Sequence, residues 1–194
     1  NRVAGQSIRR QIATQDLADY PPPPMDIPVQ PVDAVFLDYF RKTAVFASTD
    51  KSRGAIQGVY LDVSDKKGHV LVGTDGRRLT ALNTLNLPIE KSLVLPVGKF
   101  LLWKGLSGDL SIGAKANSNA LWFRLVTPRW TYTSQTLDAT YPNWRQVMPH
   151  GEGAHTVTFS QEDVALLRKA LPGFPGHDRS DGLVRLTGKD GRLT

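Results

Sequence analysis

The chain has 194 residues, with 24 Lys and Arg against 18 Asp and Glu, a net charge of +6 and no cysteine. The lack of cysteine excludes a disulfide framework, a thiolate zinc site and a cysteine nucleophile, and it fits a reducing cytoplasm. No stretch approaches the ~20 apolar residues that a membrane-spanning helix needs. The positive charge favours a polyanionic partner such as nucleic acid, with an ordinary basic surface as the alternative.

The N-terminal part of the chain contains one half of a long-range repeat. The sequence TQDLADYP at 14–21 recurs as SQTLDATYP at 134–142, and this spacing indicates a repeat of domain size. The prolines that follow, at 21–24, 28 and 31, exclude helix and favour polyproline II geometry. We therefore predict a connector between domains, with a ligand for a proline-binding module as the alternative.

A helix and a hairpin are predicted next. Apolar residues at 32, 35, 36, 39 and 40 fall on one helical stripe, with Asp33 as N-cap and an Asp38–Lys42 pair one turn apart. After a polar loop at 47–53, alternation at 59–64 and an extended run at 70–72 flank a polar turn. This pattern predicts a hairpin with one face toward a core.

A second round of the same elements follows. Residues 93–95 predict a buried strand, Pro96 suits the first turn of a helix through Lys104, and Gly105 ends it. Strands are predicted at 110–112, 121–126 and 130–137. Ser160 is placed as the N-cap of a third helix that ends at Leu171, and GLVRLTGKDGRLT at 182–194 repeats the pattern of GVYLDVSDKKGHVL at 58–71.

One turn carries the most specific pattern. GTDGRRL at 73–79 follows the predicted hairpin, and Gly76 can take the positive φ that a tight turn needs. In this setting it resembles the ATDGHRL motif of the bacterial sliding clamp, the beta subunit of the replicative DNA polymerase. LVLPVGKFLLWKGL at 93–106 resembles that family's second strand and helix, and YPNWRQVMP at 141–149 resembles its FPDYRRVLP.

The resemblance implies an α+β clamp fold, in which strand–helix–strands units repeat and the helices cover one face of antiparallel sheets. It implies the end of a first domain with its connector at 1–26, a complete middle domain at 27–150 and the start of a third at 151–194. We therefore expect a piece of a longer protein.

The function implied is that of a processivity factor without catalytic activity. The full-length protein would form a homodimeric ring around duplex DNA in the bacterial cytoplasm, associated with the nucleoid. DNA polymerase and clamp-loader subunits would dock through short peptides. No cofactor, metal or membrane is implied.

Two surfaces follow from the family's pattern. A peptide groove between the middle and last domains would use Ile56, Thr74, Gly76, Arg77, Arg78, Leu79, Pro142, Gln146 and Val147. Phosphates of the encircled DNA would face Arg41, Lys42, Lys51, Arg53, Lys99, Lys104, Arg168 and Lys169. Arg77 stands where the family has histidine and Gln146 where arginine is common, so partner motifs are expected to differ.

No catalytic constellation is found in the sequence. The histidines at 69, 150, 155 and 177 lack metal-ligand spacing, and neither a nucleophile elbow nor a phosphate-binding glycine loop is present. Two alternatives stay open: a clamp-derived adaptor that docks peptides without encircling DNA, and an enzyme that processes nucleic acid.

Overall fold

Two antiparallel sheets of four strands form the framework of residues 27–148. The first sheet runs in the order β10-β9-β8-β3 and the second in the order β6-β5-β4-β7. A computed structural model provides the coordinates and describes residues 2–3, 6–7, 16, 22–64, 68–118, 120–148, 158–173, 188–189 and 192–193. The chain divides into two units, 1–148 and 149–194, and each is described by itself.

The first unit consists of two strand–helix–strands repeats, one around α1 and one around α2. Each sheet contains three strands from one repeat and one strand from the other. The strands after the first helix are β4 (Gly58–Asp62), β5 (His69–Thr74) and β6 (Leu79–Leu85), and they take β7 (Leu93–Pro96) from the second half. The strands of the second half are β8 (Leu110–Ala116), β9 (Leu121–Val126) and β10 (Thr131–Gln135), and they take β3 (Gln30–Val32) from the first. The exchange interlocks the two strand–helix–strands repeats.

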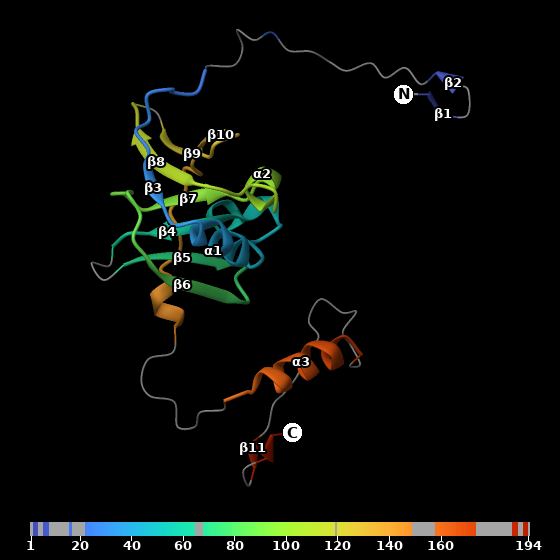
Figure 1. The fold of residues 1–194 in the computed structure, drawn as a ribbon. Coiled ribbons are helices and arrows are strands. Elements are labelled where there is room, and N and C mark those ends of the chain that lie inside the picture. Colours follow the sequence, from blue (N-terminus) through green and yellow to red (C-terminus); the bar gives the residue numbers. More distant parts are fainter. Residues whose placement is uncertain are drawn as a thin grey trace. The chain divides into compact units, whose positions relative to one another are not determined.

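The helices α1 (Val35–Ala44) and α2 (Lys99–Leu102) lie next to each other over one side of the sheets (Figure 1). Beneath them lies one continuous core. Phe36 and Phe40 of α1, Leu101 of α2, Leu61 of β4 and Phe123 of β9 are all fully buried in it. Burial of side chains of this size contributes about 1.5–3 kcal/mol each, so α1 is held mainly by its apolar stripe.

The opposite side of the second sheet is also covered, which the alternating pattern did not predict. We call this set of residues the outer cluster; it comprises the buried Ala55, Val70, Val72, Val94 and Tyr141 and the partly buried Ile56, Tyr60, Leu79, Ala81, Leu137 and Trp144. The segment that follows β10 covers this cluster, since Tyr141 stacks on Tyr60 with ring centroids 4.6 Å apart. β4 therefore has two buried faces.

Most predicted elements are confirmed, with corrections at their ends. Val32 belongs to β3 rather than to the first helix, which begins at Val35. The N-cap of this helix is Ala34 and not the predicted Asp33, although the Asp33 carboxylate accepts from the Val35 amide (2.8 Å). The predicted pair of Lys42 with Asp38 is present (2.7 Å). The second helix is only four residues long, because Gly98 and Trp103 on either side have extended backbones.

Among the elements that were not predicted are η2 and β6. The last three residues of the predicted polar loop, 51–53, belong to a kinked 3-10 helix, η2 (Lys51–Gln57), and β6 forms from residues that were assigned no strand. Strand β6 was missed because its apolar residues follow neither strict alternation nor a continuous run, so its pairing with β5 decides its conformation.

The remaining described residues form short elements. In the second unit α3 (Gln161–Ala170) begins with the predicted Ser160 cap, which forms a capping box with Asp163, and η4 (Leu171–Gly173) follows. β11 (Gly188–Lys189) pairs with β12 (Arg192–Leu193), and near the N-terminus β1 (Arg2–Val3) pairs with β2 (Gln6–Ser7). The repeated sequence at 14–21, apart from residue 16, and most of 182–194 lie outside the described residues. Among the described helices, none has the length and apolar character needed to cross a membrane.

Candidate functional site

The turn from Thr74 to Leu79 is rigid because Asp75 organises its backbone. One Asp75 carboxylate oxygen accepts from the amides of Arg77 and Arg78, both at 2.9 Å, and the other accepts from the Arg78 Nε at 3.1 Å. The Thr74 hydroxyl donates to the Arg78 carbonyl (2.6 Å) and accepts from the Gly76 amide (3.0 Å). Gly76 has φ +88°, as the sequence predicted.

The same turn is bound to neighbouring segments by two arginines. Arg53 of η2 donates from Nη1 to the Asp75 carbonyl at 2.9 Å, and the Arg78 guanidinium lies 5.2 Å from the centre of the Phe46 ring. The Arg78 and Arg77 amides and the Arg78 side chain lower the pKa of Asp75 to about 2. The carboxylate therefore stays ionised, and the exposed Arg77 side chain is presented from a fixed backbone.

Leu79, at the end of the turn, and Ile56 of η2 both belong to the outer cluster, where their side chains are half-buried. Tyr141 lies in the same cluster with its hydroxyl 3.4 Å from the Val72 carbonyl, and burial raises its pKa to about 12. Pro142, the next residue, is exposed. Apolar side chains that are partly exposed beside a polar turn can accept one or two side chains of a partner peptide.

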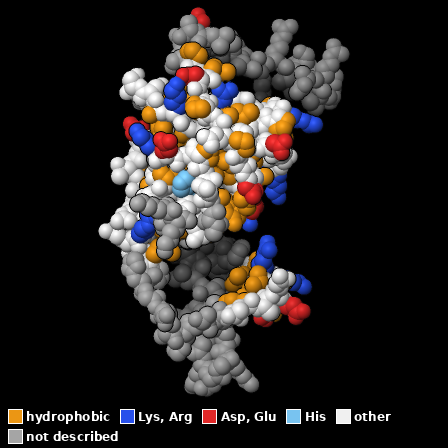
Figure 2. All heavy atoms as spheres, turned by 60° about the vertical axis from the view of Figure 1, so that its left-hand side comes forward, with side chains coloured by type: hydrophobic (Ala, Val, Ile, Leu, Met, Phe, Trp, Pro, Cys, Tyr) orange, Lys and Arg blue, Asp and Glu red, His pale blue; other side chains and the backbone are white. Residues whose placement is uncertain are grey.

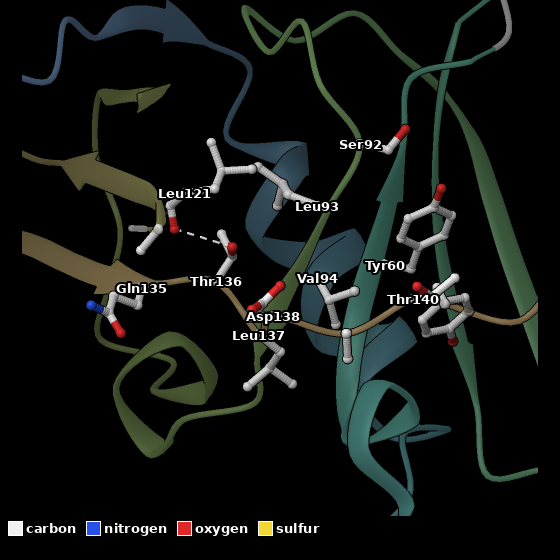
Figure 3. Close-up of a pocket in the computed structure, with 13 residues that line it drawn as sticks. Tyr60, Ser92, Leu93, Val94, Leu121, Gln135, Thr136, Leu137, Asp138 and Thr140 are labelled. Atoms are coloured by element: carbon white, nitrogen blue, oxygen red, sulfur yellow. Dashed lines mark hydrogen bonds between the residues drawn. The ribbon is translucent and has the colours of Figure 1, made fainter. Parts of the chain in front are cut away.

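A pocket of about 810 Å³ opens at the edge of the outer cluster (Figure 3). Tyr60 and Val94 form one wall of it, while Leu121 and the segment from Gln135 to Tyr141 form the other. The Thr136 hydroxyl donates to the Leu121 carbonyl at 3.1 Å, which keeps this crossing segment against β9. The outer side of the unit is therefore hollowed next to Tyr141.

The short helix η3 (Trp144–Val147) is fixed to the sheet by one buried carboxylate. Asp62, the last residue of β4, is 2% exposed; it accepts from Trp144 Nε1 at 2.9 Å and from the Arg145 guanidinium. Its other oxygen accepts from the amide and hydroxyl of Ser64 at 2.9 and 2.6 Å. Arg145 also lies over the Trp144 ring, 4.4 Å from its centre.

These contacts determine both the charge of Asp62 and the exposure of η3. Burial by itself raises the pKa of Asp62, but the hydrogen bonds from Ser64, Trp144 and Arg145 outweigh it and lower the pKa to about 2. Because Trp144 and Arg145 face the sheet, Gln146 and Val147 are left exposed, and Val147 is 70% exposed. The side chain of Val147 is therefore accessible to a partner.

The structure thus places the predicted groove residues on or beside the outer cluster. The residues that fix them were missed by the sequence reasoning: Asp75, Asp62, Trp144, Arg145 and Tyr141. Asp75 could have been found, because Asp followed by Gly is typical of a turn in which the carboxylate accepts from amides two and three residues on. The role of Asp62 depends on a residue 82 positions away and carries no local pattern.

The predicted DNA-facing residues fall into different environments. Lys42, Lys99 and Lys104 are exposed on or just after α1 and α2, and Lys51 is exposed in η2. Arg53 binds the turn of Asp75 instead of projecting alone. On the face that Figure 2 shows, basic side chains are scattered among acidic and apolar ones. Arg168 and Lys169 are exposed in the last turn of α3, in the second unit.

Arg41 has a structural role within the first unit. Its guanidinium donates to the carbonyls of Leu101 (3.3 Å), Trp103 (2.7 Å) and Leu106 (3.0 Å). The short helix α2 ends here and leaves carbonyls without helical partners, and Arg41 satisfies them. We therefore omit Arg41 from the proposed DNA contacts below.

No cluster of three or more His, Asp or Glu residues that could hold a metal ion occurs within the described residues. His69, the histidine of β5, accepts from the Leu87 amide through Nδ1 at 3.2 Å, and burial lowers its pKa. It is thus a satisfied, neutral residue of the sheet. The other histidines lie outside the described residues.

Comparison with known proteins gives matches at the level of structure. No protein-family model and no curated protein matches the sequence. Among solved structures, the Helicobacter pylori beta clamp bound to a DNA ligase peptide has TM-score 0.56 and 22% identity, covering 71% of this chain and 40% of that one. The Bartonella birtlesii sliding clamp bound to griselimycin has TM-score 0.55 and 23% identity, covering 70% and 39%.

A third match is the DNA polymerase III subunit beta of Borrelia burgdorferi in complex with a natural product, with TM-score 0.57 and 20% identity. It covers 70% of this chain and 36% of that chain, so the present chain spans less than half the length of each of these structures. The structure has antiparallel sheets with helices on one side, and the matched structures are sliding clamps. Both findings agree with the predicted α+β clamp fold. The chain therefore has the fold of the bacterial DNA sliding clamps.

Proposed function

We propose that this chain is part of a DNA sliding clamp, and that its outer cluster with the Asp75 turn and η3 docks short peptides from replication and repair proteins. The observation that carries the proposal is the convergence of the residues predicted for a peptide groove on one side of a clamp fold. The H. pylori clamp, which shares this fold, binds a DNA ligase peptide.

Docking would combine an apolar anchor with a polar rim. One or two partner side chains inserted beside Ile56, Leu79 and Val147 would contribute about 2 kcal/mol each. The exposed guanidinium groups of Arg77 and Arg78 would pair with acidic residues of the peptide. Since Gln146 carries no charge, a partner is expected to hydrogen-bond with it rather than form an ion pair there.

For the full-length protein we propose a head-to-tail homodimeric ring around duplex DNA, with three domains in each subunit, divided as expected from the sequence. Exposed cations near α1, α2 and α3, among them Lys42, Lys99, Lys104, Arg168 and Lys169, would contact phosphates that exchange as the ring slides. Retention would result from topology, so no covalent chemistry is required. DNA polymerase and clamp-loader subunits would be the docked partners, at the nucleoid.

The groove is tested by the affinity of a fluorescent peptide from a bacterial DNA ligase. Leu79→Ala removes an apolar wall of the groove, and we expect about a tenfold loss of affinity, measured by anisotropy. Arg78→Glu should weaken binding by charge reversal. Leu102→Ala, an exposed leucine of α2, is the matched control and should leave the affinity unchanged. Unchanged affinity in folded Leu79→Ala would exclude Leu79 from the site.

The ring is tested separately with the full-length protein. A loaded clamp should stay on nicked circular DNA and run off linear DNA, because only the linear form has ends. Equal loss from both forms, with peptide binding intact, would show an adaptor that does not encircle DNA. Turnover of labelled DNA or nucleotide by purified protein would instead show an enzyme.

A further inference from the structure

Four aromatic side chains, two of them exposed and two partly buried, lie together at the C-terminal end of α2. We define the aromatic patch as Phe100, Trp103, Trp130 and Tyr132. Phe100 stacks on Tyr132 with centroids 5.3 Å apart and planes at 12°, and the Trp103 and Trp130 rings meet edge to face at 5.8 Å and 87°. Trp103 is 47% exposed and Trp130 is 46% exposed. Tryptophan side chains are highly buried on average, so two neighbouring indoles that are half exposed are unusual.

Contacts with neighbouring residues hold the two tryptophans of the aromatic patch in place. Trp103 packs against Gly105, where a Cβ would come within 2.4 Å of its ring, so a larger residue at this position would displace the indole. The Trp103 carbonyl is bound by Arg41 of α1 at 2.7 Å. Trp130 follows a tight turn in which its amide donates to the Thr127 hydroxyl at 3.0 Å. The indoles are therefore positioned before any partner arrives, which reduces the entropy cost of binding.

Three cations adjoin these aromatic residues in the sequence. Lys99 lies in α2, Lys104 directly follows Trp103 and Arg129 directly precedes Trp130, and all three are exposed. Within the part of the chain that the structure describes, none of them forms an ion pair. The one acidic residue of segments 97–109 and 127–132 is Asp109. Exposed aromatic rings interleaved with unpaired cations are the combination that binds single-stranded nucleic acid, because bases stack on the rings while phosphates meet the cations.

We infer that the aromatic patch, with Lys99, Lys104 and Arg129, is a stacking site for the bases of single-stranded DNA. Paired bases in a duplex are already stacked on one another and cannot cover Trp103 or Trp130, so the site should distinguish single strands from duplex. This site needs neither the peptide-docking face nor a closed ring, and its residues are distinct from those of the groove.

The direct experiment compares two fluorescein-labelled 20-mers on the unmodified chain at low salt. One is oligo(dT), and the other is an abasic strand with the same phosphates and no bases. Stacking of one or two bases predicts that oligo(dT) binds about 5- to 100-fold more tightly and that it quenches tryptophan fluorescence. Equal affinity for both strands would overturn the inference, and this test does not depend on the folding of any variant.

Variants then locate the site. Trp103→Leu with Trp130→Leu should reduce oligo(dT) affinity by a similar factor while changing duplex affinity less than about twofold, whereas Lys99→Glu with Lys104→Glu should weaken both. Lys91→Ala, an exposed lysine before the start of β7, is the charge control. A loss of single-strand and duplex binding in equal proportion in the tryptophan variant would contradict a stacking site.

Sedimentation of the same tryptophan variant tests the other possible occupant. If the leucine substitutions convert a self-associated chain into a monomer, the patch is an interface with another copy of the protein, and the inference fails. Unchanged sedimentation together with lost oligo(dT) binding supports it. Because Leu79→Ala affects only peptide docking, failure of the groove and failure of this site give different results.

Discussion

At the scale of single residues, two carboxylates decide the shape of the candidate site. Asp75 determines the turn that presents Arg77, and Asp62 fixes the helix that presents Val147. Neither carboxylate is itself predicted to touch a partner. Both are held ionised by hydrogen bonds, with pKa values of about 2, so the geometry of the face should change only when the pH falls below about 4.

Asp62→Asn should make the stability of the first unit less dependent on pH. The folded pKa of Asp62 is about 2, below its ordinary value of 3.8, so the ionised group stabilises the fold above pH ~4 and loses that contribution as the pH falls toward 2. With allowance for screening by solvent at Arg145, we expect ionised Asp62 to contribute about 1–2 kcal/mol to the free energy of unfolding. Urea unfolding of wild type and variant at pH 7 and pH 3 measures it.

The asparagine variant should be less stable than wild type at pH 7, and the two proteins should approach each other near pH 2. Asp138→Asn, at an exposed position of the segment after β10, is the control and should follow the wild-type curve. Parallel curves for wild type and Asp62→Asn across this range would show that the Trp144 and Arg145 contacts contribute nothing to stability.

At the scale of elements, the short helix α2 depends on α1. A helix of four residues cannot satisfy its own terminal carbonyls, and isolated helices of this length are unstable. Arg41 supplies donors for three of the carbonyls in and after α2. Arg41, which the family resemblance implied would face DNA, is thus part of the connection between the two repeats.

Arg41→Met should destabilise the first unit by about 2–3 kcal/mol, because partly buried carbonyls lose a charged donor. Arg41→Lys should recover less than half of this loss, since a single ammonium group cannot reach three separated carbonyls. Urea unfolding at pH 7 measures both. Lys42→Met, one position along, removes an exposed cation that pairs with Asp38 and lies over the Tyr39 ring; it is the control and should change stability little. An Arg41→Met protein as stable as wild type would contradict this role.

At the scale of the whole first unit, the exchange of β3 and β7 makes the two repeats dependent on each other. Each sheet lacks a strand without the other half, and the core crosses the boundary, as in the contact of Phe36 with Phe123 at 6.3 Å between ring centres. The unit should therefore unfold in a single cooperative transition.

Separate fragments 27–91 and 92–148 should each lack a cooperative thermal transition by circular dichroism, because each exposes an unpaired sheet edge and half a core. Mixed in equal amounts they should recover part of the signal of intact 27–148, which is the control. A sharp transition in either fragment alone would show that the repeats are independent domains.

Much of the secondary structure could be predicted from local sequence. Alternation at 59–63, the buried run 93–95 and the Ser160 cap lie in the elements expected of them, because period, burial and capping are properties of neighbouring residues. The groove residues came from a resemblance in short motifs rather than from pattern. Strand β6 and the brevity of α2 could not be predicted, since pairing with β5 and donation by Arg41 are both contacts from elsewhere in the chain.

The sequence by itself thus determined the helices α1 and α3, most of the strands and the turn at Gly76, all of which follow from the preferences of adjacent residues. Only the tertiary structure decided that the repeats exchange strands, that Arg41 serves α2, and that Asp62 holds η3 from 82 positions away. The physical reason is that a buried polar group must find a partner wherever the fold brings one within reach, and no local pattern records which partner that is.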